Sequence, residues 1–161
     1  MMKPIDFKTR FWSKVDKKNA DGCWIWVASK SRKGYGRIGR EYPKTGSCQA
    51  HRVAWEFVYG EIPKGIQVDH ICHNRACVNP EHLRLATNSQ NSWNQLVAKN
   101  NTSGFKGVSW DNHEKKWIAY IRVNGKLIRL GKFSIISDAS SAYCDAAKRY
   151  FGEFAYVGPK P

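Results

Sequence analysis

The sequence of 161 residues has few acidic side chains and no long apolar run. Only 13 Asp and Glu accompany 27 Lys and Arg, so the formal net charge is +14. An excess of this size points to a polyanionic partner, while charge alone leaves a merely basic, well-solvated surface as the alternative that the motifs must decide. No stretch approaches the roughly 20 apolar residues of a membrane span, and Asp6 and Arg10 stand where a signal peptide would have its apolar core. We therefore expect a cytoplasmic protein with no membrane partner.

Internal repeats are absent, and the one low-complexity tract is the polar run from Lys99 to Gly104. Its composition is typical of a flexible connector between segments of different pattern. We therefore expect an N-terminal domain over residues 1–99, a linker over 100–104 and a C-terminal domain over 105–161. Both domains have an excess of basic residues, so both are expected to respond to the charge of the partner.

The N-terminal domain is expected to mix short strands with one clear helix. Residues 23–27 and 34–38 are rich in aromatic and β-branched side chains and predict two strands, joined by the basic turn 30–33. Apolar residues recur at helical spacing over 51–59, where Gly60 is a fitting stop. A short strand is predicted over 66–70.

The C-terminal domain is expected to contain three strands and a helix. The strands are predicted over 107–110, 117–123 and 127–130. Between the last two, Asn124-Gly125 predicts a two-residue hairpin turn, because both turn positions require a positive φ. An alanine-rich helix follows, with Ser137 as the expected N-cap and Gly152 as its end. The fold class predicted for the chain is α+β.

Two of the five cysteines and one of the five histidines lie close together in the chain and could bind a soft metal. Cys72, Cys77 and His82 fall within eleven residues. In a reducing cytosol such clusters favour metal ligation over disulfides, and zinc prefers four tetrahedral thiolate and imidazole donors. The fourth ligand must come from elsewhere in the chain. Cys23 is our first choice because it opens a strand that can pack beside the loop, and Cys48 is the alternative.

An acidic residue and a histidine precede this cluster. Asp69-His70 ends the strand predicted over 66–70, and Asn91 follows 21 residues after His70, early in a helix that Asn88 could cap. This combination suits phosphodiester hydrolysis, in which a hard oxygen ligand holds a divalent cation while the imidazole takes a proton from water.

Together these residues resemble the HNH endonuclease motif in the form shared by phage homing endonucleases. The resemblance rests on Asp69-His70, on the group Cys72, Cys77 and His82-Leu83, and on Asn91. It extends upstream through Cys23-Trp24-Ile25-Trp26, Gly34-Tyr35-Gly36 and Ala50-His51-Arg52, and so covers most of residues 10–95. It implies a ββα-metal fold in which His70 is the general base, Asn91 binds a catalytic Mg²⁺ and Asp69 is the second ligand of that ion.

The sequence also departs from the common HNH pattern. His82 stands where many of these enzymes have their middle asparagine, and we assign it to zinc, as in the similar His-Cys box family. Asn79 lies in a turn before Pro80 and is assigned a structural role. Asp69 has no counterpart before the base histidine of the His-Cys box enzymes, so the chain lies between the two patterns.

The C-terminal segment resembles an AP2 domain over residues 102–155. The resemblance rests on Gly104-Phe105-Lys106-Gly107-Val108, Lys116 to Arg122, Arg129 to Phe133 and the alanine-rich helix. It implies a three-stranded antiparallel sheet laid into the DNA major groove, with the helix packed behind it. Ser109 and Asp111 stand where that family often has arginines, so its sequence preference does not transfer.

We assign seven residues of this segment to DNA binding. Arginine can read guanine edges, whereas lysines more often contact phosphates. The assigned residues are Lys106, Trp110, Lys116, Tyr120, Arg122, Lys126 and Arg129.

The expected function is that of a site-specific, homing-type DNA endonuclease with structural Zn²⁺ and catalytic Mg²⁺. Its expected partner is double-stranded DNA, and no protein partner is implied. Two alternatives remain open at this point. One is a DNA-binding regulator in which the zinc only stabilises the fold, although Asp69, His70 and Asn91 would then have no evident role. The other is a nuclease without sequence preference.

Overall fold

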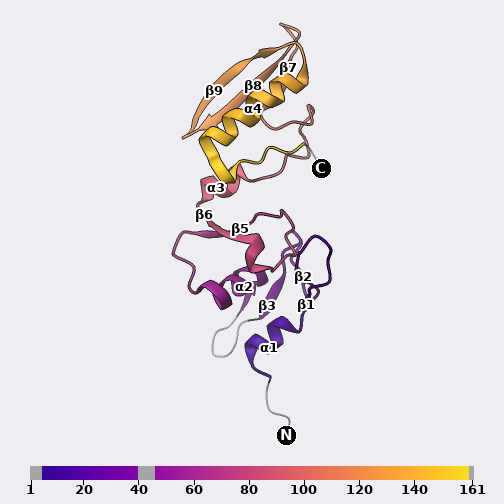
Figure 1. The fold of residues 1–161 in the computed structure, drawn as a ribbon, viewed down its shortest axis with the longest axis vertical. Helices are drawn as coiled ribbons and strands as arrows, with labels where there is room; N and C mark the ends of the chain where they lie inside the picture. The colour runs from indigo at the N-terminus through magenta and orange to yellow at the C-terminus, as the bar shows by residue number, and fades with distance from the viewer. Residues whose placement is uncertain (1–4, 40–45, 160–161) are drawn as a thin grey trace. The chain divides into compact units, whose positions relative to one another are not determined.

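The computed structural model describes residues 5–39 and 46–159 and divides the chain into two compact units, Met1–Asn88 and Ser89–Pro161 (Figure 1). In the described part, no helix combines the length and the apolar character needed to cross a bilayer. The division falls earlier in the chain than the linker predicted over 100–104, so residues 89–99 group with the second unit rather than the first.

Contacts inside the second unit explain this difference. The ring of Trp93 stacks on that of Phe151 with centroids 4.4 Å apart, and the backbone N–H of Tyr156 donates to the carbonyl oxygen of Trp93. The polar run itself forms a turn, in which the N–H of Gly104 donates to Asn101 Oδ1 at 2.7 Å. Composition indicated a flexible connector, but the amide and hydroxyl side chains of the run bond to nearby backbone groups instead.

In its described residues, the first unit contains two short helices, a 3₁₀ turn and six short strands. In chain order these are α1 (Phe7–Trp12), β1 (Val15–Asp16), β2 (Ile25–Trp26), β3 (Arg37–Gly39), β4 (Ser47–Gln49), α2 (Ala50–Tyr59), β5 (Gln67–His70), η1 (Pro80–His82) and β6 (Leu83–Ala86). The strands pair antiparallel as β1–β2, β3–β4 and β5–β6. Buried aromatic and aliphatic side chains from α1, β2, α2 and β5 make one core, which includes Phe11, Trp26, Val53, Ala54 and Val68.

The two strands predicted over 23–27 and 34–38 exist in shortened form but do not pair with each other. Instead, β2 bonds to the segment that follows β5: the N–H of Trp26 donates to Ala76 O at 2.8 Å, and the N–H of Val78 donates to Trp24 O at 2.7 Å. The backbone at Gly36 meets the Trp26 side chain, where an added Cβ would lie 2.7 Å from the indole ring. These tertiary bonds draw the chain after Cys23 against the Cys77 loop.

Helix α2 and strand β5 follow their predictions closely. Helix α2 ends at Tyr59, and Gly60 beyond it has φ +87°. Strand β5 pairs with β6 in a register that sets Asp69 opposite Arg84 and His70 opposite Leu83. The helix α3 (Asn88–Trp93) comes next in the chain and spans the division between the units. Two antiparallel strands followed by a helix is the order of elements that the HNH resemblance implies.

The second unit is a three-stranded antiparallel sheet with a helix lying across one face (Figure 1). Its elements are β7 (Val108–Asp111), β8 (Lys116–Val123), β9 (Lys126–Phe133), α4 (Ile136–Phe151) and the 3₁₀ turn η2 (Gly152–Phe154). Asn124 and Gly125 have φ +48° and +79°, which confirms the predicted hairpin. Helix α4 begins at Ile136 after Ile135, which makes no side-chain cap, so the prediction of Ser137 as N-cap was wrong.

Candidate active site and metal centre

His70 ends strand β5 and is almost fully buried, at 6% exposed. Its Nε2 lies 3.0 Å from the carbonyl oxygen of Cys77. A carbonyl can only accept, so the neutral imidazole must hold its proton on Nε2, and its lone pair lies on Nδ1. Burial lowers the pKa of His70, and the hydrogen bond to Cys77 opposes that shift. The fold thus fixes both the orientation and the tautomer of a potential proton acceptor.

Asp69 precedes His70 and is also buried. Its Oδ2 lies 3.2 Å from Nε of Arg84, directly across the β5–β6 pair, and both side chains are largely shielded from water. A buried carboxylate requires such compensation. Its oxygens are also the hard donors that Mg²⁺ prefers, so the donor chemistry fits the predicted ligand role.

Asn91, the other predicted Mg²⁺ ligand, lies in α3 on the Ser89 side of the division and is half-buried. Its role beside His70 therefore stays a prediction. Asn88, the predicted cap of this helix, accepts a hydrogen bond at its Oδ1 from Nε2 of Gln67, at 2.5 Å.

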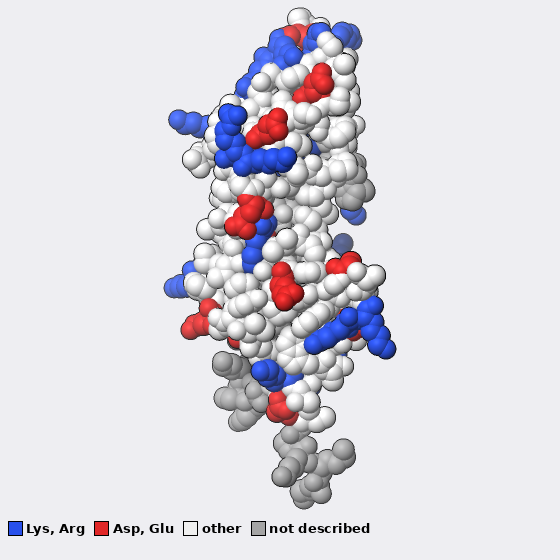
Figure 2. Space-filling view, viewed as in Figure 1, with Lys and Arg blue, Asp and Glu red and all other residues white. Residues whose placement is uncertain are grey.

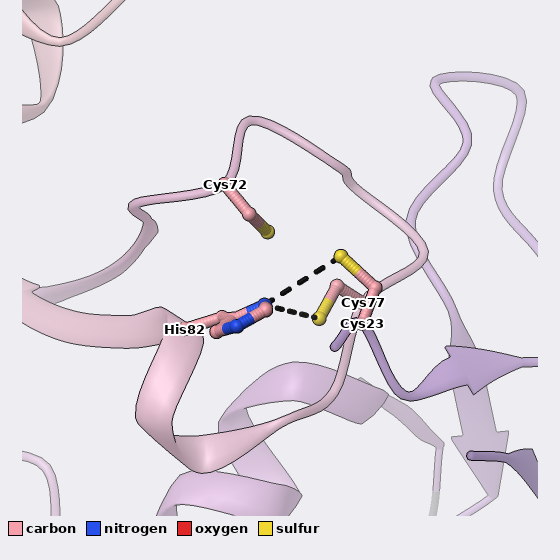
Figure 3. Close-up of side chains that lie close together, drawn as sticks. All are labelled: Cys23, Cys72, Cys77 and His82. Carbon is pink, nitrogen blue, oxygen red and sulfur yellow. Dashed lines mark hydrogen bonds between the residues drawn. The ribbon is translucent and has the colours of Figure 1, made fainter. Parts of the chain in front are cut away.

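The four predicted zinc ligands come together (Figure 3). One ligand atom from each of Cys23, Cys72, Cys77 and His82 lies within 4.8 Å of every other. Nδ1 of His82 is 3.5 Å from Cys23 Sγ and 3.7 Å from Cys77 Sγ. Cys48, the alternative fourth ligand, donates instead to the carbonyl oxygen of Ile38 at 3.6 Å. The structure therefore places Cys23, rather than Cys48, beside the other three candidate ligands.

The protonation of these thiols indicates how well the cluster suits a cation. Burial and the neighbouring Cys77 raise the pKa of Cys23 to about 11. A hydrogen bond between Cys72 and Cys77 raises the pKa of Cys72 and lowers that of Cys77 to about 5. Only one thiolate is thus favourable among the bare thiols, because several negative charges would repel one another in a small buried space. A divalent cation reverses this balance, and three thiolates with one imidazole form a zinc-type donor set.

The loop over residues 71–79, between β5 and η1, contains Cys72 and Cys77 and is called the metal loop below. Asn79 organises this loop, in keeping with its predicted structural role. Its Oδ1 accepts from the N–H of Glu81 and caps η1, while its Nδ2 donates to Gly22 O at 2.8 Å. Its backbone N–H also approaches Cys77 Sγ at 3.4 Å. The side chain thereby ties the segment before Cys23 to the segment after Cys77 and orients the ligands of both.

Strand register assigns the predicted DNA-binding residues of the second unit to different faces of the sheet. Ala119 and Ile121 pack on the α4 side, and Ile118 lies on the other face, because successive side chains of a strand point to opposite faces of the sheet. Four of the predicted residues share that open face, away from α4: Lys116, Tyr120, Arg122 and Arg129, which pairs with Tyr120.

The other three predicted DNA-binding residues do not share this face. Trp110 pairs with Trp117, and Lys126 with Val123, so both lie on the α4 side of the sheet. Lys106 is half-buried, and its Nζ donates to the carbonyl oxygens of Trp93 and Gln95 at 2.7 and 2.8 Å. Burial lowers the pKa of Lys106 to about 8. These bonds give Lys106 a role inside the unit, and we leave it out of the DNA-binding face.

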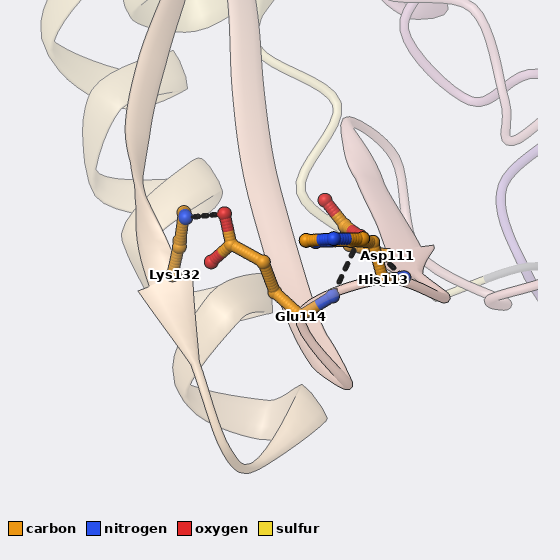
Figure 4. Close-up of polar contacts among 4 residues, drawn as sticks. All are labelled: Asp111, His113, Glu114 and Lys132. Atoms are coloured by element: carbon orange, nitrogen blue, oxygen red, sulfur yellow. Dashed lines mark hydrogen bonds and ion pairs between the residues drawn. The ribbon is translucent and has the colours of Figure 1, made fainter.

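The turn between β7 and β8 is ordered by polar contacts (Figure 4). Oδ1 of Asp111 accepts from the N–H groups of His113 and Glu114 at 2.9 and 3.0 Å, and the Glu114 carboxylate forms an ion pair with Lys132 of β9. Asp111, one of the departures from the AP2 pattern, thus shapes this turn.

Two residues beside His70 were not predicted as part of the site. The rings of Tyr35 and His51 lie 5.9 and 4.6 Å from the ring of His70, measured between centroids. Both belong to the strings quoted for the HNH resemblance, but nothing in the local pattern distinguishes them from ordinary core positions. The packing of α2 against β5 brings His51 to this position, and Tyr35 comes from the segment just before β3.

The first unit combines an antiparallel strand pair that ends in a buried histidine with a Cys₃His cluster that could hold a metal ion. A family model described as HNH endonuclease matches residues 48–93, from β4 to α3. A protein of Acanthamoeba polyphaga mimivirus, named as an uncharacterized HNH endonuclease, is 33% identical over 133 residues, which span 80% of this chain and 67% of the relative. The chain belongs to the HNH endonuclease family.

Two relatives from Escherichia phage T7 match shorter regions. Protein 3.8 is 42% identical over 76 residues, which span 47% of this chain and 63% of the T7 protein. Protein 2.8 is 35% identical over 91 residues, which span 56% of this chain and 60% of the T7 protein. This chain therefore covers less than two thirds of the length of either T7 relative.

Proposed function

We propose that this protein is a DNA endonuclease in which His70 is the general base for phosphodiester hydrolysis. The observation that supports this most directly is the bond from Nε2 of His70 to the Cys77 carbonyl, which leaves the lone pair on Nδ1. The family relationship supports the same reaction. The viral origin of the relatives fits a place of action inside an infected cell.

In this mechanism Nδ1 of His70 accepts a proton as the oxygen of a water molecule attacks the phosphorus. The bond from phosphorus to the 3′ oxygen breaks, the departing oxygen takes a proton from solvent, and the products have 5′-phosphate and 3′-hydroxyl ends. Asp69 and Asn91 would hold the Mg²⁺, which when bound supplies positive charge to the departing oxygen. Arg84 forms an ion pair with the Asp69 carboxylate and holds it in place within its buried position.

The Cys₃His cluster is assigned to Zn²⁺ with a structural role. All four of its donors are used in holding β2, the metal loop and η1 together, which leaves no open position for a substrate. Catalysis and structure are therefore assigned to two different metals.

The second unit is assigned to DNA binding as an AP2-like module that gives the enzyme a homing-type preference for particular sites. Lys116, Tyr120, Arg122 and Arg129 would contact duplex DNA from the open face of the sheet. Basic side chains are visible over both units in Figure 2, interspersed with acidic side chains. This distribution supports a role for each unit in binding a polyanion.

Incubating the purified protein with supercoiled plasmid tests the proposed activity. With Mg²⁺ we expect nicked or linear product, and with EDTA we expect none, because the cation stabilises the leaving oxygen. Mapping the ends separates a preferred site from indiscriminate cleavage. Binding without cleavage at any Mg²⁺ concentration would favour the regulator alternative and contradict the proposal.

Replacing Arg122 and Arg129 with glutamine is expected to weaken DNA binding and relax site preference. Each arginine that reads a base should cost about 1 to 3 kcal/mol when lost. The matched control is Lys148→Gln with Arg149→Gln, which removes the same charge from exposed positions on α4, behind the sheet. Equilibrium binding to the mapped site, measured over a range of salt concentrations, provides the readout. Equal losses in the two double variants would show that only net charge matters and that the open face has no special role.

A further inference from the structure

His51 is a buried polar residue to which the mechanism above gives no task. It lies in the first turn of α2 and is 3% exposed. Its Nδ1 stands alone, among the side chains that the structure describes, as a fully buried nitrogen or oxygen without a hydrogen-bond partner. A buried polar atom of this kind costs stability comparable to a lost hydrogen bond, so its presence requires an explanation.

The surroundings of His51 connect it to the base. Its ring centroid lies 4.6 Å from that of His70, with 56° between the ring planes, and 5.5 Å from that of Tyr35. The three rings form one cluster at the end of β5. His51 is therefore one of the residues that pack against the His70 ring and can fix its orientation.

Packing alone does not explain a histidine at this position. Phenylalanine would fill a similar space among these rings without burying an unpaired nitrogen. Burial, and then the nearby His70 and Arg52, lower the pKa of His51 to about 3, so its imidazole is neutral near pH 7. A neutral imidazole has one donor and one acceptor nitrogen and can hold a water molecule without adding charge.

We propose that His51 is a positioning residue of the active centre, which orients His70 through ring contact and through a water molecule bound at His51 Nδ1. This proposal rests on the proposed function, since it assigns His51 a task in the same reaction. The positioning role requires the Nδ1 atom of His51 as well as its ring, whereas a purely structural role would require only the ring.

Three substitutions separate the nitrogen from the ring. His51→Phe keeps a ring and removes both nitrogens. His51→Asn keeps a polar atom bonded to Cγ, where Nδ1 lies, and His51→Leu matches asparagine in shape but is apolar. His113→Phe is the control, because His113 is exposed in the β7–β8 turn. For each variant, the cleavage rate at saturating DNA, the KM and the melting temperature are measured in Mg²⁺.

We expect His51→Phe to melt at or above the wild-type temperature, to keep its KM and to lose about 10- to 10²-fold in kcat, the usual effect of a slightly misplaced catalytic group. His51→Asn should cleave faster than His51→Leu. Wild-type kcat in His51→Phe, or equal rates for Asn and Leu, would overturn the proposal and leave the proposed function standing. A wild-type protein that cleaves no DNA would overturn both.

Discussion

Replacing His70 with alanine is expected to lower the rate of DNA cleavage by about 10²- to 10⁴-fold, the usual contribution of a positioned general base. The loss follows from the removal of Nδ1, since the bond from Nε2 to the Cys77 carbonyl holds the imidazole in a single tautomer. The rate is measured in single turnover with Mg²⁺ present, and DNA affinity is measured separately. Affinity should change little, because the assigned binding residues lie elsewhere in the chain.

Two additions make this experiment specific to the base. Free imidazole should restore part of the lost rate in His70→Ala, because truncation leaves space for a diffusible base. His113→Ala controls for the loss of a histidine far from the proposed chemistry in sequence. If His70→Ala cleaves at the wild-type rate, or if imidazole has no effect while affinity is also lost, His70 is not the base.

Removing the metal is expected to unfold the first unit. Structural zinc contributes an apparent binding free energy of about 10 to 16 kcal/mol in small zinc domains, which matches or exceeds the whole stability of an ordinary domain, about 5 to 15 kcal/mol. Replacing Cys72 and Cys77 with serine removes two of the four donors and should abolish cooperative melting of this unit. Tryptophan fluorescence reports the transition, because Trp26 is fully buried in the core of the unit.

The control for this variant replaces Cys48 and Cys144 with serine, which removes the same number of thiols outside the cluster. Both thiols donate to backbone carbonyls, of Ile38 and Val157, and a hydroxyl can do the same. This control should melt like the wild-type protein and retain one zinc per chain in metal analysis. A native protein without zinc, or unchanged melting after loss of Cys72 and Cys77, would contradict the structural-zinc assignment.

The sequence alone determined what local chemistry could specify. The pair Asn124-Gly125 predicted a hairpin turn, because both turn positions require a positive φ. Apolar residues at helical spacing, followed by a glycine, predicted α2. The close spacing of Cys72, Cys77 and His82 predicted that these three side chains lie together, because a short loop brings them close whatever the rest of the fold does.

The tertiary structure decided everything that depends on which distant segments meet. Cys23 rather than Cys48 joins the cluster because β2 bonds to the metal loop instead of pairing with the strand over 34–38. Residues 89–99 belong to the second unit because Trp93 finds its stacking partner there. His51 lies against His70 because α2 packs on β5. Spacing along a chain specifies turns, faces and short loops, whereas contacts between remote residues arise only when the whole core closes and buries them together.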